Sequence, residues 1–223
     1  MSSVTHVSQS RSGAGKRATA PFISFIDDDV EVTTTWAENI LKTFSLNDTI
    51  IGVTGPTWVT DDLRGNRDIF KFVKIKKFLD WFFQVPNEPG MLSPCGAHSI
   101  ASNNRWQQYT GPVTYLECCN MSFRREAFHK FKGFDTIYRE TAEWHEPDLC
   151  MRMMGHGVLF YNQAVSLFHR ISADGAYKKR LSTSHRWRNF MIFQKRWVPT
   201  TPRSLLYRLF VRIYFWLKQT TLI

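Results

Sequence analysis

The sequence predicts an α/β fold with a parallel or mixed sheet, from three observations near its N-terminal end. Residues 22–26, FISFI, form a short apolar run with the β-branched and aromatic content typical of a buried strand. Residues 33–45 place four large apolar side chains at helical spacing, and residues 49–56 form a second apolar run that ends in Gly-Pro. A strand, a crossover helix and another strand indicate an α/β sheet.

Composition and charge narrow the class of protein. The chain has 223 residues, of which 43% are hydrophobic and 15% aromatic, so it fits one folded domain with an appendage and not a disordered chain. A formal net charge of +10 predicts an anionic partner: phosphate, nucleic acid or a lipid surface. No nucleic-acid recognition motif accompanies the charge, and the basic residues are dispersed among aromatic ones. We therefore expect no nucleic-acid partner.

The four cysteines, at positions 95, 118, 119 and 150, show neither the density of a disulfide scaffold nor the paired spacing of a zinc site. We expect them to be reduced, in a cytosolic setting. The N-terminal residues lack the apolar core of a secretory signal, so nothing at that end indicates export.

The chain divides into three parts. Residues 1–20 are polar, small and basic and predict a loop or frayed segment, residues 21–200 carry the α/β domain, and residues 201–223 predict a basic amphipathic helix. Within the domain, repeated prolines and glycines mark residues 86–112 as a long irregular stretch, which is usually functional or mobile. The remaining predicted elements are a strand over 113–123, a short helix stopped at Gly133, a helix over 147–157 and one or two short strands over 158–170.

Two segments, residues 67–83 and 203–223, combine basic residues with large apolar ones. Each fits a helix docked on the domain by its apolar side, and each also fits a helix that lies on an anionic membrane surface. The second segment is not predicted to span a bilayer, because Arg208 and Arg212 leave no apolar run near the ~20 residues required.

Asp27, Asp28 and Asp29 directly follow the first predicted strand. Adjacent carboxylates repel one another, so they lower stability unless a cation or a helix start compensates. One interpretation is structural, because acidic residues are favourable at the start of the helix that follows. The other is functional: ligands bind off the carboxyl ends of strands in open α/β sheets, where two carboxylates can hold Mg²⁺ or Mn²⁺ together with substrate phosphates. The triplet alone leaves both interpretations open.

Further motifs follow the aspartates in a fixed order. CNMSFRREAFHKFKGFD spans 119–135, EWHEPDLCMRMMGHGVLFYNQAVSLFHR spans 143–170, and RNFMIFQKRWVP spans 188–199. With the aspartate strand, these stretches resemble the family 2 glycosyltransferases, whose members carry a DxD-type triplet, a segment like CNMSFRRE, a GFD, an acidic motif opening a DLCxR helix, and a final HR. The resemblance covers residues 15–198. It implies a GT-A-like mixed sheet flanked by helices, and transfer of a sugar from a nucleotide-diphosphate donor with inversion at the anomeric carbon.

The resemblance implies a role for each aspartate. Asp27 and Asp29 match the DxD pair of metal ligands, with Asp29 the more direct ligand and Asp27 nearer the nucleotide ribose, while Asp28 is expected to support the donor-binding site from behind them. His169 matches a position near the metal or the diphosphate, although a lone histidine is also common as a structural residue. The implied cofactor is Mg²⁺ or Mn²⁺, and the implied donor is a UDP- or GDP-linked sugar.

The resemblance also implies a catalytic carboxylate. Glu146 stands where the family places its general base, which removes the proton from the acceptor hydroxyl for in-line attack on the sugar. Asp148 is its partner at the helix start, and it equally fits a first-turn acid that complements the helix dipole. Family members often show Glu-Asp at this motif, whereas this chain has His145 and Glu146.

Two pairs of basic residues complete the expected donor site. Arg124 and Arg125 are expected to clamp the diphosphate, since arginine suits bidentate phosphate contacts, although they also fit an ordinary helix surface. Lys16 and Arg17 resemble the basic element that precedes the aspartate strand in the family. The stretch GAGKR is not a P-loop, because Ser10 occupies the first glycine position and Arg17 replaces the required Ser or Thr.

Family members begin with further strands and helices upstream of anything present here. We therefore expect a fragment of a longer protein, a chain that depends on a partner chain for the missing half, or a diverged protein with a reduced donor site.

Two classes of function stay open. One is a cytoplasmic enzyme, peripheral at the inner membrane face, that glycosylates a glycan or lipid-linked acceptor. The other is a noncatalytic protein of the same fold that binds membrane, glycan or another subunit; the intact acidic motifs favour the enzyme.

Overall fold

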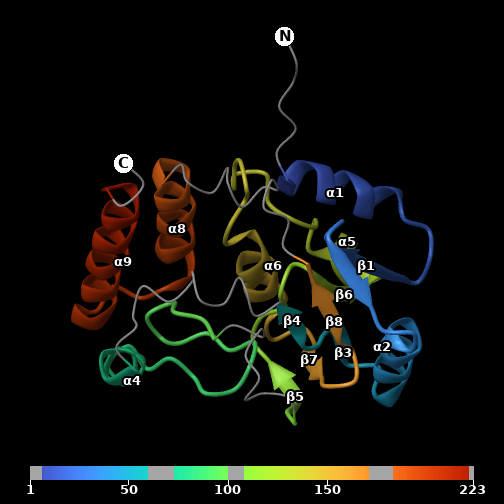
Figure 1. Ribbon diagram of the computed structural model, residues 1–223. Coiled ribbons are helices and arrows are strands. Elements are labelled where there is room, and N and C mark those ends of the chain that lie inside the picture. Colours follow the sequence, from blue (N-terminus) through green and yellow to red (C-terminus); the bar gives the residue numbers. More distant parts are fainter. Residues whose placement is uncertain (1–6, 60–72, 100–107, 171–182, 221–223) are drawn as a thin grey trace.

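The computed structural model describes residues 7–59, 73–99, 108–170 and 183–220. Within these ranges the chain forms two mixed sheets with helices packed around them, which confirms the predicted fold class (Figure 1). β6 runs antiparallel to both β1 and β3, whereas β3 and β7 are parallel. The order in the five-stranded sheet is β1 (Phe22–Ile26), β6 (Asn120–Arg124), β3 (Ile50–Thr54), β7 (Val158–Asn162) and β5 (Thr110–Val113).

The three-stranded sheet brings distant parts of the chain to the aspartates. Its order is β2 (Val30–Val32), β8 (Leu167–His169) and β4 (Thr57–Val59). β2 begins directly after the aspartates, and its first residue, Val30, pairs with His169 at the end of β8. This register places His169 next to the triplet.

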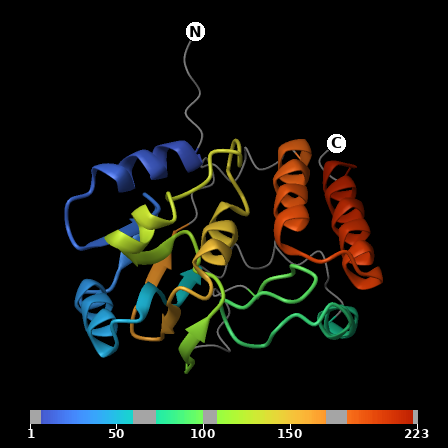
Figure 2. The ribbon, with the colours of Figure 1, turned by 180° about the vertical axis from the view of Figure 1, so that it is seen from behind.

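Helices cover both faces of the five-stranded sheet. α2 (Trp36–Leu46) packs on one face, and α5 (Arg125–Lys130) and α6 (His145–Met153) pack on the other. A second group of helices lies on the far side of α6 from α2, as both views show (Figures 1 and 2). It consists of α4 (Val73–Phe82), α8 (Thr183–Trp197) and α9 (Pro202–Thr220). Residues 67–72 of the predicted basic helix lie outside the described residues.

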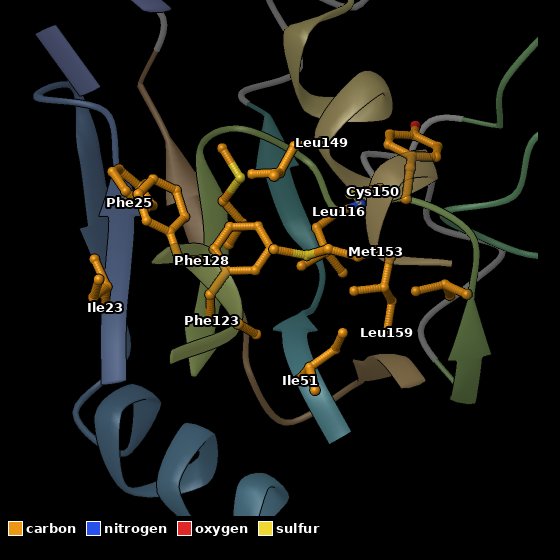
Figure 3. Close-up of a cluster of buried hydrophobic side chains, with 14 of the residues drawn as sticks. Ile23, Phe25, Ile51, Leu116, Phe123, Phe128, Leu149, Cys150, Met153 and Leu159 are labelled. Atoms are coloured by element: carbon orange, nitrogen blue, oxygen red, sulfur yellow. Dashed lines mark hydrogen bonds between the residues drawn. The ribbon is translucent and has the colours of Figure 1, made fainter. Parts of the chain in front are cut away.

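The main core lies between the sheet and helices α5 and α6 (Figure 3). Phe128, Leu149 and Met153 are almost completely buried in it. Burying a side chain of this size contributes about 1.5–3 kcal/mol. The packing therefore fixes the position of α6, and with it the two acidic residues of its first turn, Glu146 and Asp148.

The structure corrects the strand predicted over residues 113–123. β5 ends at Val113 and β6 begins at Asn120, so two strands replace one. β5 falls mostly inside the stretch predicted as irregular, because an edge strand tolerates Gly111 and Pro112. Asn120 pairs with Ile26, so the start of β6 lies beside the end of β1.

Residues 7–17 form helix α1 (Val7–Arg17), where the sequence predicts a loop or frayed segment. That prediction is wrong because tertiary contacts hold the helix despite its polar, glycine-containing sequence. The hydroxyls of Ser8 and Ser12 donate to the carbonyls of Tyr138 and Phe134, both at 2.7 Å. Gly15 lies so close to Phe128 of α5 that an added Cβ would collide with the ring. Small side chains therefore let α1 pack at short range.

Helix α9 is docked on α8 by one face and exposes the other. The guanidinium of Arg208 donates to Gln194 Oε1 at 3.1 Å, and that of Arg212 lies 5.8 Å from the centre of the Trp187 ring. Arg208 and Arg212 therefore help to dock α9 on the domain, which is one of the two interpretations that the sequence allows. Six large apolar side chains of α9 are exposed: Leu205, Leu206, Leu209, Ile213, Trp216 and Leu217. No helix among the described residues is both long enough and apolar enough to cross a bilayer.

Candidate functional site

The aspartates lie between β1 of one sheet and β2 of the other. Ligand atoms of Asp27, Asp29 and His169 all lie within 4.8 Å of one another, and His169 Nε2 is 3.0 Å from Asp29 Oδ1. All three residues are partly exposed, and Asp28 between the two aspartates is more exposed. The two carboxylates supply the oxygen ligands that Mg²⁺ and Mn²⁺ prefer, and the imidazole adds one nitrogen ligand. The structure thus brings together the three residues that the motifs indicate as metal ligands.

Arg11 of α1 forms an ion pair with Asp27. Its positive charge opposes the mutual repulsion of the aspartates, and among the residues that the structure describes its buried Nη1 has no hydrogen-bond partner. Sequence reasoning missed Arg11, because it treated the N-terminal segment as a loop, and it pointed to Lys16 and Arg17 instead. Those two residues are exposed in the last turn of α1. Arg11 is therefore the residue of α1 that contacts the aspartates, and a donor contact from Lys16 or Arg17 stays a prediction.

Asn120 connects the surrounding elements beneath the aspartates. Its side chain is buried at the start of β6, accepts a hydrogen bond from Trp36 Nε1 at 3.0 Å, and donates to the carbonyl of Val165 at 2.7 Å. The hydroxyl of Thr54 donates to the backbone carbonyl oxygen of Asn120 at 2.6 Å. Asn120 therefore ties α2, β3 and the turn before β8 to the strand that neighbours β1.

Arg124 and Arg125 lie at the opposite end of β6 from the aspartates. Because β1 and β6 are antiparallel, Arg124 pairs with Phe22, the first residue of β1. Its guanidinium donates to the carbonyls of Ile50 and Phe44, both at 2.8 Å. Arg125 starts α5 at the same end of the strand. The expected diphosphate clamp is therefore wrong, and Arg124 instead links β6 to the start of β3 and the end of α2.

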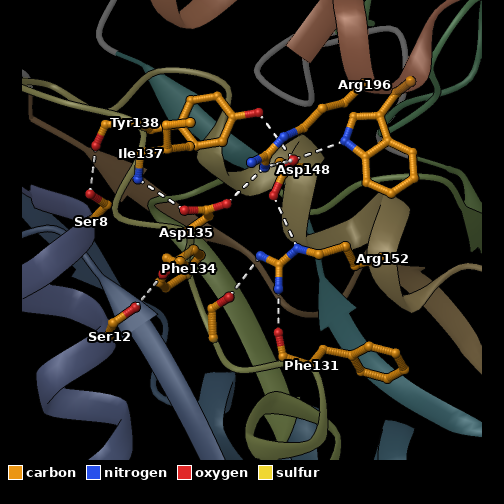
Figure 4. A network of polar contacts seen from close by, with 12 residues as sticks. Ser8, Ser12, Phe131, Phe134, Asp135, Ile137, Tyr138, Asp148, Arg152 and Arg196 are labelled. Atoms are coloured by element: carbon orange, nitrogen blue, oxygen red, sulfur yellow. Dashed lines mark hydrogen bonds and ion pairs between the residues drawn. The ribbon is translucent and has the colours of Figure 1, made fainter. Parts of the chain in front are cut away.

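Asp148 is fully buried at the centre of a polar network (Figure 4). Its carboxylate accepts hydrogen bonds from Tyr138 Oη at 3.1 Å, Arg152 Nε at 3.0 Å, Arg196 Nη1 at 3.1 Å and Trp197 Nε1 at 2.8 Å. Four donors occupy nearly all the acceptor capacity of a carboxylate. The catalytic expectation for Asp148 is therefore corrected to a structural role, which joins α6 to α8 and to the loop after α5.

Glu146 occupies a different environment from Asp148. Its side chain is 17% exposed, and its Oε1 lies 3.6 Å from His145 Nε2. Ligand atoms of Cys118, His145 and Glu146 lie within 4.8 Å of one another. Cys118 precedes Asn120 by two residues, so this cluster lies near the edge of the sheet where Asp27 follows β1. Glu146 therefore keeps the access that a general base needs.

Backbone strain accompanies this cluster. Glu140, Ala142 and Trp144, in the loop before α6, have φ angles of 57°, 53° and 78°. A non-glycine residue in this region costs on the order of 1–3 kcal/mol, and such residues tend to cluster at active sites and ligand-binding sites. The ring of Trp144 packs 5.2 Å from Phe190 and 5.1 Å from Phe193 of α8, which holds the start of α6 in this conformation.

Two buried histidines make stability depend on pH. Burial lowers the pKa of His98 and of His145, and the Glu146 carboxylate opposes that shift in both. The unfolded chain takes up these protons near the ordinary pKa of about 6.5, so the unfolded state binds more protons below that pH. We expect the contribution of the two histidines to the unfolding free energy to be fully present above pH 6.5. Below that pH it should fall by at most about 1.4 kcal/mol per pH unit for each histidine. Urea unfolding at pH 7 and at pH 5.5 measures the slope, and His98→Gln should reduce it; an unchanged slope contradicts the prediction.

A pocket of about 270 Å³ opens elsewhere, between α6, α8 and residues 92–96. Met151, Met154, Phe193 and Trp197 form much of its wall, and no acid, base or cysteine among the described residues lines it. The aspartate cluster does not contribute to it. We assign the pocket no chemistry, because its lining offers no titratable group.

Comparison of the sequence with known proteins finds no match, whereas comparison of the structure does. No protein family and no curated protein matches the sequence. The structure is similar to that of GalNAc-T7 with UDP, GalNAc and Mn²⁺, at a TM-score of 0.58 and 12% identity, over 86% of this chain and 34% of that chain. A looser similarity, at a TM-score of 0.46 and 12% identity, is to the mannosyltransferase PcManGT from Pyrobaculum calidifontis in complex with GDP-Man and Mn²⁺, over 91% of this chain and 47% of that one.

The chain thus spans about a third of the length of the first of these structures. The similarity to GalNAc-T7 shows a fold of the GT-A glycosyltransferase type, which is the fold that the motifs predict.

Proposed function

We propose that the chain carries the catalytic region of a glycosyltransferase, which moves a sugar from a nucleotide-diphosphate donor to a hydroxyl of a glycan or lipid-linked acceptor. The observation that carries the proposal is the cluster of Asp27, Asp29 and His169 after the C-terminal end of β1. In open α/β sheets that end of the strands is where ligands bind. The family 2 character and the inversion of configuration rest on the motifs quoted above.

Each residue of the site has a role in this proposal. Asp29 and His169, with Asp27, hold Mg²⁺ or Mn²⁺, and Arg11 fixes the position of the Asp27 carboxylate. When bound, the ion supplies positive charge that stabilises the diphosphate leaving group. Glu146 takes the proton of the acceptor hydroxyl while the oxygen bonds to the anomeric carbon and the bond from that carbon to the diphosphate breaks on the opposite face.

Calorimetric titration with UDP and with GDP, first in Mn²⁺ and then in EDTA, tests the donor site. We expect at least one nucleotide to bind in Mn²⁺ and to be lost in EDTA. Glu146→Gln should keep that binding and lower the rate of sugar transfer or donor hydrolysis roughly 10²–10⁴-fold. A folded chain that binds neither nucleotide in Mn²⁺ overturns the proposal in favour of the noncatalytic alternative.

We also propose that the exposed face of α9 rests on a membrane surface at the cytoplasmic side. Its six large apolar side chains are 43–61% exposed. On α4, Phe78 and Trp81 are exposed as well, and Phe82 of the same helix lies 5.9 Å from the guanidinium of Arg203 of α9. The exposed apolar residues of α9 recur three to four positions apart, which places them on one side of the helix, and such an apolar side is typical of a helix at the lipid interface. The support comes from this apolar face, because Arg208 and Arg212 contact α8.

Co-sedimentation with phosphatidylcholine vesicles, with and without an anionic lipid, tests the membrane proposal. We expect binding that strengthens with anionic lipid, and a loss of about 10²-fold in Leu206→Glu/Leu209→Glu, because each leucine contributes about 1.5–3 kcal/mol when it leaves water. Leu41→Glu is the matched control, since Leu41 is 52% exposed on the distant helix α2. Equal losses in the control and in the α9 variant contradict the proposal.

A further inference from the structure

A second cluster of metal-ligand side chains lies where α6 begins. The Sγ of Cys118, a ring nitrogen of His145 and a carboxylate oxygen of Glu146 lie within 4.8 Å of one another. Its chemistry differs from that of the aspartate cluster, because it contains a thiol and a single carboxylate. Thiolate, imidazole and carboxylate are ligands of zinc, whereas Mg²⁺ and Mn²⁺ prefer sites built mainly from oxygen.

His145 provides an independent sign that a ligand belongs here. Its side chain is 1% exposed, and within the described residues neither Nδ1 nor Nε2 makes a hydrogen bond of normal length, although the backbone of Ala142 lies near the ring. A buried polar group left unsatisfied lowers stability, and a bound cation would remove that cost. The ring is held in place by an edge contact with Phe134, whose centre lies 4.6 Å away. Its Nε2 faces the Glu146 carboxylate at 3.6 Å.

The spacing of the cluster fits a tetrahedral ion. Zinc bonds of about 2.0–2.3 Å place neighbouring ligand atoms roughly 3.3–3.8 Å apart. The separation of 3.6 Å between His145 Nε2 and Glu146 Oε1 already meets that requirement, and the Cys118 Sγ, within 4.8 Å of both residues' ligand atoms, has to approach by at most about 1 Å. Cys118 and Glu146 are both partly exposed, so an ion can enter. Three protein ligands leave a fourth position open to water or to a substrate group.

We propose that Cys118, His145 and Glu146 form a zinc site distinct from the aspartate cluster, and that zinc bound there inhibits sugar transfer. Glu146 has a role both as a zinc ligand and as the general base. A carboxylate that ligates zinc cannot at the same time take the proton of the acceptor hydroxyl. The inhibition rests on the proposed function; the binding of zinc does not.

Titration of the metal-free full chain with Co²⁺, a spectroscopic substitute for Zn²⁺, tests the site without a catalytic assay. We expect one equivalent to produce thiolate-to-cobalt charge-transfer absorption and the visible bands of a tetrahedral ion, and one equivalent of Zn²⁺ to abolish both. Cys118→Ser should remove the charge-transfer absorption, and His145→Gln should lower zinc affinity at least about 10²-fold, since even the loss of a supporting residue costs 10–100-fold.

Two matched controls separate this site from its neighbours. Cys119→Ser removes the adjacent thiol, and Asp27→Asn/Asp29→Asn removes the other cluster; both should keep the thiolate signal, with folding checked by circular dichroism. A signal that survives in Cys118→Ser, or a folded wild-type chain without any thiolate signal, overturns the zinc site.

Where transfer is measurable, zinc should inhibit the wild type and a chelator should restore its activity, while Cys118→Ser should resist zinc. Absence of transfer with an intact cobalt signal leaves the zinc site standing and counts against the proposed function alone.

Discussion

Replacing Asp29 with asparagine is expected to lower Mn²⁺-dependent nucleotide binding at least about 10²-fold while the chain stays folded. Asp29 lies 3.0 Å from His169 in the cluster, so the substitution removes a charged ligand and the partner of a second ligand. It also removes one of three adjacent negative charges, which limits the effect on stability. Calorimetric titration with UDP and GDP in Mn²⁺ measures the binding, and thermal unfolding reports on the fold.

Asp28→Asn is the matched control for this experiment. It makes the same change of charge one residue away, on a side chain that lies outside the cluster. We expect it to bind nucleotide nearly as the wild type does. An equal loss in both variants would mean that the net charge of the triplet matters and that Asp29 has no special role as a ligand.

Asp148→Asn is expected to lower the unfolding free energy by about 3–5 kcal/mol, the usual cost of removing one partner from a buried ion pair. The substitution leaves Arg152 and Arg196 facing an uncharged amide in a fully buried position, and it replaces one acceptor oxygen with a donor. Urea unfolding followed by circular dichroism measures the change.

Asp135→Asn provides the comparison, because Asp135 binds the same Arg196 at 2.7 Å but is 32% exposed. Partly exposed ion pairs contribute only about 0–1 kcal/mol, so this variant should lose no more than that. If Asp148→Asn were as stable as Asp135→Asn and instead lost catalysis, the structural role of Asp148 would be wrong and its catalytic interpretation would return.

Hydrophobic periodicity was sufficient to predict the elements around the first half of the sheet. The strand at residues 22–26, the helix after it and the strand at 50–54 all form as expected, because their apolar spacing is local information. The direction of β6 is not local information. It depends on which strands flank it, and its antiparallel placement between β1 and β3 carries Arg124 and Arg125 away from the aspartates.

The candidate site divides in the same way. Asp27, Asp29 and His169 are identified by motifs that keep their order along the chain, and the structure places them together. Arg11 carries no such signal, since its contact with Asp27 depends on helix α1, whose sequence lacks apolar periodicity. Asp148 shows the opposite case: its motif position matches a catalytic residue, but four hydrogen-bond donors from three segments occupy it.

The pairing of β1 with β6 has a consequence for how the molecule assembles. The hydroxyls of Ser24 and Ser122 lie 2.7 Å apart although 98 positions separate them in the chain. The entropy of closing so long a loop is lost before the pairing provides any energy, and sheets dominated by such contacts typically fold in milliseconds to seconds. The acidic cluster depends on a loop closure that is longer still, since Asp29 and His169 are 140 positions apart, so we expect it to be absent from the transition state for folding. A divalent ion that recognises the finished cluster should therefore slow unfolding and leave the folding rate unchanged.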